Sequence, residues 1–66
     1  MDITLNGESR TLPDDYRILD LLRNEGLAER RVAVEINGSI VPRSAHAAHP
    51  LQPGDRVEIV HALGGG

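Results

Sequence analysis

Apolar and polar residues alternate in several short segments of this 66-residue chain, and glycine or proline separates these segments. Near the N-terminus, Ile3 and Leu5 alternate with polar neighbours and are followed by Asn6-Gly7. Asn-Gly is typical of a type I′ hairpin turn, because both central residues of that turn take positive φ. Residues 8–12 are expected to return as a second strand. The pattern therefore predicts an N-terminal β-hairpin whose apolar side chains face the core.

Between residues 16 and 26 the apolar residues are spaced three or four positions apart, which is the period of an α-helix. Either Asp14 or Asp15 is expected to cap the first turn, where acidic side chains are also favourable. Gly26 is placed to end the helix at the position after its last residue. The segment predicts an amphipathic helix of about three turns, which needs tertiary packing to be stable. The apolar residues on its predicted core face are Ile18, Leu21 and Leu22.

A second Asn-Gly pair, Asn37-Gly38, lies between two further segments with a strand pattern. Residues 31–36 are the first arm, and residues 39–42 are the second arm, which a proline cuts short. A second hairpin is therefore predicted. Residues 44–50 lack a strand pattern, and we interpret them as a short turn of helix. The residues expected on the core face of the first arm are Val32, Val34 and Ile36.

The last predicted strand covers residues 56–62 and follows a Pro-Gly pair suited to the centre of a type II turn. Val57 and Ile59 are expected on the core face, and Val60 on the opposite face. The order of elements predicts an α+β fold in which one main helix packs on one face of a mixed four- or five-stranded sheet. Val60 is then either an isolated surface valine or part of a docking patch for an enzyme that acts on the end of the chain.

Three glycines, Gly64, Gly65 and Gly66, end the sequence directly after the last strand. Without a Cβ they form a thin thread that fits where side chains would collide. The segment from Leu63 to Gly66 spans roughly 13 Å when extended. We expect a globular domain of residues 1–63 and a flexible tail of residues 64–66, and we expect the tail's reactive group to be the α-carboxylate of Gly66.

Composition excludes several classes of function. A chain of 66 residues forms one domain with a small core. It has no cysteine, so disulfides, thiolate metal sites and a cysteine nucleophile are excluded. Its net charge of -3 and single aromatic residue are unlike those of a nucleic-acid binder. No apolar run is long enough for a membrane helix, and no signal-peptide pattern is present. These features predict a soluble, cytoplasmic protein that binds neither nucleic acid nor membrane.

Side chains capable of catalysis or metal binding are few. His46 and His49 form a His-x-x-His pair, and His61 adds a third imidazole, a number sufficient for zinc. No cysteine or framing helix motif accompanies them, so ordinary surface or turn histidines are the favoured interpretation, and no metal is expected. The serines lack a nucleophile-elbow motif, which argues against a hydrolase.

The order of these features in so short a chain resembles the thiamine-biosynthesis sulfur carrier (ThiS) family, which has a ubiquitin-like β-grasp fold. The resemblance covers the whole chain. The residues that carry it are Asn37-Gly38 with Ile40-Val41-Pro42-Arg43, the Pro53-Gly54-Asp55 turn before Val57-Glu58-Ile59-Val60, and the final Gly65-Gly66.

The resemblance implies that this chain is a carrier protein on which enzymes act, and that it is not itself an enzyme. A ubiquitin-activating-type adenylyltransferase, using ATP and Mg²⁺, would adenylate Gly66. Persulfide sulfur from a cysteine desulfurase would convert it to a thiocarboxylate, and thiazole synthase would take that sulfur for the thiazole ring of thiamine. The chain itself is expected to bind no cofactor and to be a monomer when free. The expected partner-binding residues are Val60, Leu63, Gly64 and Gly65.

Other functions remain open on the residues alone. The same tail chemistry could serve molybdopterin synthesis, or the synthesis of cysteine or other sulfur metabolites. A ubiquitin-like modifier joined to target lysines through Gly66, or a β-grasp interaction domain, would belong to a different class. An interaction domain would not need a free Gly-Gly end, so adding a residue after Gly66 distinguishes it from the carriers.

Overall fold

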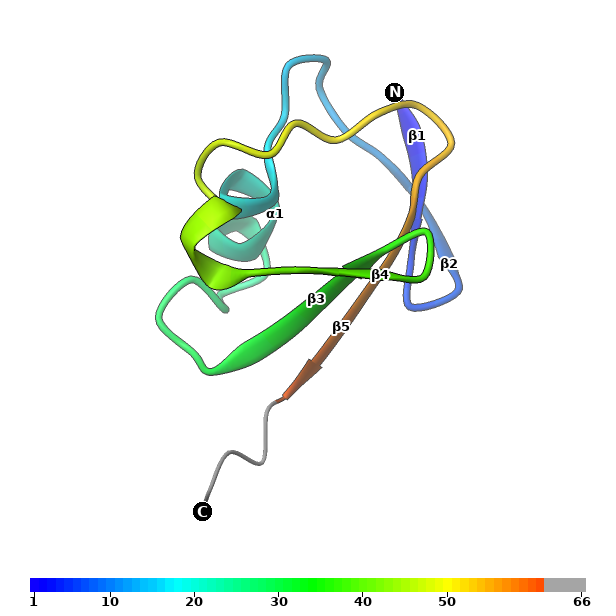
Figure 1. The fold of residues 1–66 in the computed structure, drawn as a ribbon. Coiled ribbons are helices and arrows are strands. Elements are labelled where there is room, and N and C mark those ends of the chain that lie inside the picture. Colours follow the sequence, from blue (N-terminus) through cyan, green and yellow to red (C-terminus); the bar gives the residue numbers. More distant parts are fainter. Residues whose placement is uncertain (62–66) are drawn as a thin grey trace.

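The structure, a computed structural model, describes residues 1–61, which form a mixed five-stranded sheet with helix α1 on one face (Figure 1). The order across the sheet is β2-β1-β5-β3-β4, so β5 is central, parallel to β1 and antiparallel to β3. The predicted α+β architecture is confirmed. The elements are β1 (Asp2–Leu5), β2 (Glu8–Thr11), α1 (Ile18–Asn24), β3 (Val32–Ile36), β4 (Ser39–Val41), the 3₁₀ helix η1 (Arg43–Ala45) and β5 (Arg56–His61).

Both predicted Asn-Gly turns are confirmed. Asn6 and Gly7 have φ values of 50° and 85°, and Asn37 and Gly38 have values of 52° and 87°. These left-handed conformations are the ones that a type I′ turn requires. They bring β1 and β2 into one antiparallel hairpin and β3 and β4 into another.

The core lies between the sheet and α1, and the predicted core faces are confirmed. Ile18 and Leu21 of the helix, Val34 of β3 and Val57 of β5 have no measurable exposure. Because these four side chains come from three different elements, their packing joins the helix to the two central strands. The full set of buried apolar residues is Ile3, Leu5, Leu12, Ile18, Leu21, Leu22, Val34, Ile36, Leu51, Val57 and Ile59.

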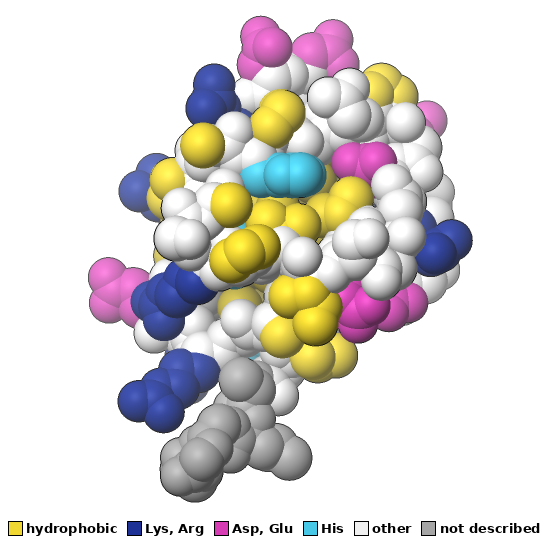
Figure 2. Space-filling view, viewed as in Figure 1, with side chains coloured by type: hydrophobic (Ala, Val, Ile, Leu, Met, Phe, Trp, Pro, Cys, Tyr) yellow, Lys and Arg dark blue, Asp and Glu magenta, His cyan; other side chains and the backbone are white. Residues whose placement is uncertain are grey.

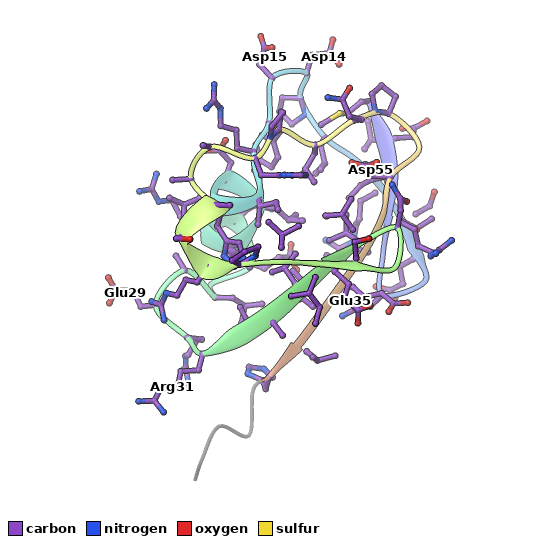
Figure 3. All side chains as sticks on the ribbon, in the orientation of Figure 1. Asp14, Asp15, Glu29, Arg31, Glu35 and Asp55 are labelled. Carbon is purple, nitrogen blue, oxygen red and sulfur yellow. The ribbon has the colours of Figure 1, made fainter. Side chains whose placement is uncertain are left out.

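The predicted start of the helix is wrong. α1 has seven residues, about two turns, and neither Asp14 nor Asp15 caps it. Figure 3 shows both aspartates at the tip of a loop beyond the helix. The N-cap is Arg17, whose backbone N–H donates to Asp20 Oδ2 at 2.9 Å.

A segment distant in sequence satisfies the first turn of α1. The N–H of Leu19 donates to the carbonyl of His46 at 3.0 Å, and the N–H of Ile18 donates to the carbonyl of His49 at 3.1 Å. These are two of the donors that a helix leaves unpaired at its start. The loop after η1 therefore replaces the side-chain cap that the sequence suggested.

The predicted end of the helix is confirmed. Gly26 has a φ of 74° and directly follows the C-cap residue Glu25. Its N–H donates to the carbonyl of Arg23 at 3.1 Å, and the N–H of Leu27 donates to that of Leu22 at 2.7 Å. This pair of bonds is the Schellman motif, which a left-handed glycine makes possible.

No helix within residues 1–61 has the length and apolar character needed to cross a membrane.

Candidate functional site at the end of strand β5

Four of the five predicted site residues, Leu63, Gly64, Gly65 and Gly66, lie outside the described residues. The fifth, Val60, lies on β5, and its side chain is 55% exposed on the sheet face away from α1, as expected. β5 ends at His61, at the opposite end of the molecule from the N-terminus (Figure 1). The described part of the site is therefore the strand that leads to the glycines.

β5 is held more completely on one edge than on the other. It pairs with β3 over five residues, from Val57 opposite Ile36 to His61 opposite Val32. Its other edge pairs with β1 only at Arg56 and Val57. The pairing with β3 therefore fixes the direction of β5 as far as its last residue.

The side chain of Asn6 continues the short pairing between β1 and β5. Asn6 Oδ1 accepts from the N–H of Ile59 at 2.9 Å, and Asn6 Nδ2 donates to the carbonyl of Ile59 at 3.2 Å. β1 has already ended at Leu5, so the side-chain amide takes the place of the next residue of the strand. Satisfying both backbone groups of Ile59 removes two unpaired polar groups beside the core.

The side chain of Asn37 makes a similar pair of hydrogen bonds at the start of β5, and we call each of these two asparagine contacts a clamp. Its Oδ1 accepts from the N–H of Arg56 at 2.9 Å, and its Nδ2 donates to Asp55 Oδ1 at 3.0 Å. Asp55 is only 7% exposed, and its Oδ2 accepts from the N–H of Gln52 at 2.8 Å. Figure 3 shows Asp55 where β5 begins. The buried carboxylate therefore has partners on both oxygens, which such a group requires.

The sequence did not predict either clamp. The Asn-Gly pattern predicts only turns at Asn6 and Asn37, and the Pro-Gly pair predicts Asp55 only as the end of the Pro53-Gly54 turn. That turn is confirmed, because Gly54 has a φ of 83° and the N–H of Asp55 donates to the carbonyl of Gln52 at 3.1 Å. A hydrogen-bonding side chain in each Asn-Gly pair was the available signal, but it does not identify the strand that the amide reaches.

The outer face of the sheet combines apolar and acidic side chains. Ile40, 72% exposed, and Val60 are the exposed large apolar residues of the described chain. Glu35 and Glu58 lie directly opposite each other on β3 and β5, and neither forms an ion pair within residues 1–61. Like charges in this position are unfavourable. This face therefore suits a surface that presents apolar and basic groups.

One ion pair connects β2 to the end of α1. Arg10 Nη1 lies 3.0 Å from Glu25 Oε2. The hydrogen bond and the negative charge of Glu25 raise the pKa of Arg10 above its ordinary value. Glu25 continues the helical spacing of Ile18, Leu21 and Leu22. The ion pair with Arg10 therefore explains why an acidic residue occupies this position, where the helical pattern would place an apolar one.

The interpretation of the histidines as ordinary surface or turn residues holds for the turn position of His46, but the burial of this residue was not expected. Its ring is buried, with 5% exposure, and Nε2 lies 3.0 Å from the carbonyl oxygen of Val41. His49 is half-buried, and His61 is exposed on β5. Within residues 1–61 no three histidine, aspartate or glutamate side chains gather as a metal-binding group.

The sheet order, the helix and the central strand that leads to the C-terminal glycines define a ubiquitin-like β-grasp protein. Residues 3–66 match the ThiS family, so the match extends through the glycines. The chain belongs to the ThiS family.

Solved structures and curated relatives agree with this assignment. The crystal structure of the thiamine biosynthesis protein ThiS from Geobacter metallireducens is 33% identical, with a TM-score of 0.85 and full coverage of both chains. A solution NMR structure of a thiamine biosynthesis protein from the same organism gives a TM-score of 0.76, covering all of this chain and 88% of that one. Two proteins named thiazole synthase, from Paramagnetospirillum magneticum and Magnetococcus marinus, are each 41% identical over all 66 residues. The chain spans 20% of the length of each.

Proposed function

We propose that this chain is a sulfur carrier of thiamine biosynthesis and that sulfur is carried as a thiocarboxylate on Gly66. The observation that supports this most directly is the match to the ThiS family, which includes the final glycines. Full-length similarity to a thiamine biosynthesis protein and to part of two thiazole synthases points to the same pathway.

The proposed chemistry begins with activation of a poor electrophile. A carboxylate oxygen of Gly66 attacks the α-phosphorus of ATP in the Mg²⁺-containing site of an adenylyltransferase, and pyrophosphate leaves. A persulfide from a cysteine desulfurase then attacks the acyl-adenylate carbonyl, and AMP leaves as an acyl disulfide forms. A thiol reductant cleaves the sulfur–sulfur bond and leaves the thiocarboxylate. The persulfide is on a partner, because this chain has no cysteine.

The body of the carrier has a separate role in this proposal, which is to present the tail. β5 is fixed by its pairing with β3 and by the Asn6 clamp, so the direction of the strand is set before a partner binds. Val60 lies one residue before the end of β5 and is exposed, where a docked enzyme would contact it. Fixing the backbone of three glycines costs about 3–6 kcal/mol, so contacts with the body are needed to offset it.

Thiazole synthase is the proposed acceptor of the sulfur. In the two relatives of that name, a segment similar to this whole chain makes up one fifth of the protein. Joining a carrier to its acceptor raises their effective concentration, which is a physical reason for the arrangement. This observation favours the thiamine pathway over a carrier for molybdopterin or cysteine, and over a lysine-linked modifier.

Intact-mass spectrometry tests the carrier function directly. The protein is incubated with ATP, Mg²⁺, a ThiS-family adenylyltransferase, and a cysteine desulfurase with cysteine and a thiol reductant. We expect the mass increase that corresponds to replacing one oxygen with sulfur, and fragmentation should place it on Gly66. The matched control carries one alanine after Gly66 and should remain unmodified. The positive control is the carrier that normally partners the chosen adenylyltransferase, which must become thiocarboxylated in the same mixture. If that carrier is modified and the mass of this protein does not change, the proposal is contradicted.

The pathway is tested in a second step. Purified thiocarboxylated protein is mixed with thiazole synthase and its small-molecule substrates, and thiazole formation is followed together with return of the carrier to its original mass. We expect thiazole synthase to take up the sulfur of the thiocarboxylate and to form the thiazole as the carrier returns to its original mass. Transfer to a molybdopterin-forming enzyme instead, or formation of an amide with a target lysine, would support one of the alternatives.

A further inference from the structure

A groove of about 180 Å³ lies on the helix side of the sheet, between α1, the segment before β3, and η1. Apolar side chains from the helix and from the start of β3 form much of its lining, and two exposed arginines also border it. The apolar lining includes Leu19, Leu22, Ala28 and Val32, and the arginines are Arg30 and Arg43.

The two arginines are not neutralised by the described chain. Neither Arg30 nor Arg43 forms an ion pair with an acidic side chain within residues 1–61. Arg31 is also exposed, and Figure 3 shows Arg31 and Glu29 both pointing outward near the start of β3. Figure 2 shows basic side chains along this side of the molecule, although the net charge of the chain is -3. The groove therefore combines an apolar lining with a local positive charge.

The volume of the groove indicates what it can hold. Pockets for cofactors and drug-sized ligands typically measure about 300–1,000 Å³, which is larger than this groove. An apolar cavity of about 150 Å³ accommodates benzene. The space therefore fits a single large apolar side chain, while Arg30 and Arg43 are placed to contact carboxylates beside it.

The groove lies near the end of β5. Val32 lines it, and Val32 is paired with His61, the last residue of β5. The exposed Val60 side chain lies on the opposite face of the sheet. A partner bound in the groove would therefore contact the end of β5 from the side that Val60 does not face.

We propose that this groove binds a segment of a partner protein in which one large apolar side chain is flanked by carboxylates. Charge complementarity to Arg30 and Arg43, together with a volume suited to one side chain, favours this occupant. This surface is distinct from the outer sheet face, whose Glu35 and Glu58 favour a basic partner. The proposal goes beyond sulfur transfer and does not depend on it.

NMR titration of the ¹⁵N-labelled protein with short peptides tests this assignment. The probe is N-acetylated, C-amidated Asp-Asp-Leu-Asp-Asp. The comparison peptides replace its leucine with alanine or its four aspartates with lysine. We expect saturable shifts of the backbone amides of Leu22, Ala28 and Val32 with the probe, weaker binding when leucine is replaced, and no binding at this site by the lysine peptide.

Charge-matched variants separate a specific site from general attraction. Arg30→Gln/Arg43→Gln should weaken probe binding about threefold or more, because two carboxylate contacts are lost. Arg23→Gln/Arg56→Gln removes the same charge from exposed positions outside the groove and should leave the affinity within twofold. Unchanged amide dispersion in both variants shows that the fold is retained. No saturable shifts at millimolar peptide, equal weakening in the two double variants, or shifts centred on Val60 would each overturn the proposal.

Discussion

Replacing Asn37 should destabilise the protein much more than an exposed turn residue normally would. Its side chain makes two hydrogen bonds that join the β3–β4 turn to the start of β5. One of them is to the carboxylate of Asp55, which is 7% exposed. Asn37 also has a φ of 52°, a conformation that asparagine tolerates better than alanine does.

The expected loss follows from these contacts. A hydrogen bond to a charged group contributes about 1.5–3 kcal/mol, and the bond from the N–H of Arg56 adds about 0.5 kcal/mol because water can replace it. Asn37→Gly removes both bonds without backbone strain and should lower the free energy of unfolding by about 2–3.5 kcal/mol. Asn37→Ala adds about 1–2 kcal/mol of left-handed strain, partly offset by the greater unfolded-state entropy of glycine, so it should be the less stable variant.

Urea unfolding followed by far-UV circular dichroism provides the measurement, because the chain has no tryptophan. A 66-residue domain has a total stability of roughly 3–10 kcal/mol, so the loss should appear as a large fall in the midpoint. Asn24→Ala, at the exposed end of α1, is the control and should change stability by less than about 0.5 kcal/mol. A loss below about 1 kcal/mol for Asn37→Gly, or equal stability of Asn37→Gly and Asn37→Ala, would refute this reasoning.

Three further predictions concern the core, the helix end and the docking face. Leu21→Ala, at a fully buried position, should cost about 2–5 kcal/mol in the same unfolding assay, and a loss below 1 kcal/mol would contradict the described core. Gly26→Ala should cost about 1–2 kcal/mol through its positive φ, although a new Cβ would meet no atom within 4 Å; a neutral effect would argue against strain at this position. Val60→Thr keeps the β-branched shape without adding a charge beside Glu35 and Glu58, so it should leave the unfolding midpoint nearly unchanged but raise the KM of the proposed adenylyltransferase for the carrier; an unchanged KM would exclude Val60 from the docking surface.

The sequence predicted local elements well because their signals lie within a few residues. The left-handed turn conformations of both Asn-Gly pairs, the core face of β5 and the glycine that ends α1 were all predicted and are confirmed. Each depends on backbone permissiveness or on alternation of apolar residues, which adjacent sequence reveals.

Features that depend on contacts between distant segments were missed or predicted wrongly. The start of α1 is satisfied by the carbonyls of His46 and His49, about 30 residues away, so no local cap was required. The burial of His46 and the bonds of Asp55 likewise depend on tertiary position. Among the candidate site residues, exposure of Val60 was predicted, since the alternation in β5 determines its face.

The exposed apolar area sets a limit on how a partner can bind this carrier. Complete burial of a valine or isoleucine side chain contributes about 1.5–3 kcal/mol. Val60 is 55% exposed and Ile40 is 72% exposed, so covering both contributes about 2–4 kcal/mol. Ordering the backbone of three glycines costs about 3–6 kcal/mol, and association has a further cost of at least about 4 kcal/mol.

The enzyme proposed above must also fix the three glycines, so contacts with the two exposed apolar residues alone are insufficient for it. The deficit of several kcal/mol requires further contacts, either to the tail backbone inside the enzyme or to another surface of the body. The groove bordered by Arg30 and Arg43 lies at the same end of the molecule as Val60, but on the opposite face of the sheet from the Val60 side chain. A partner that used both faces would gain apolar burial and charge pairing together, and it would hold the end of β5 from two sides.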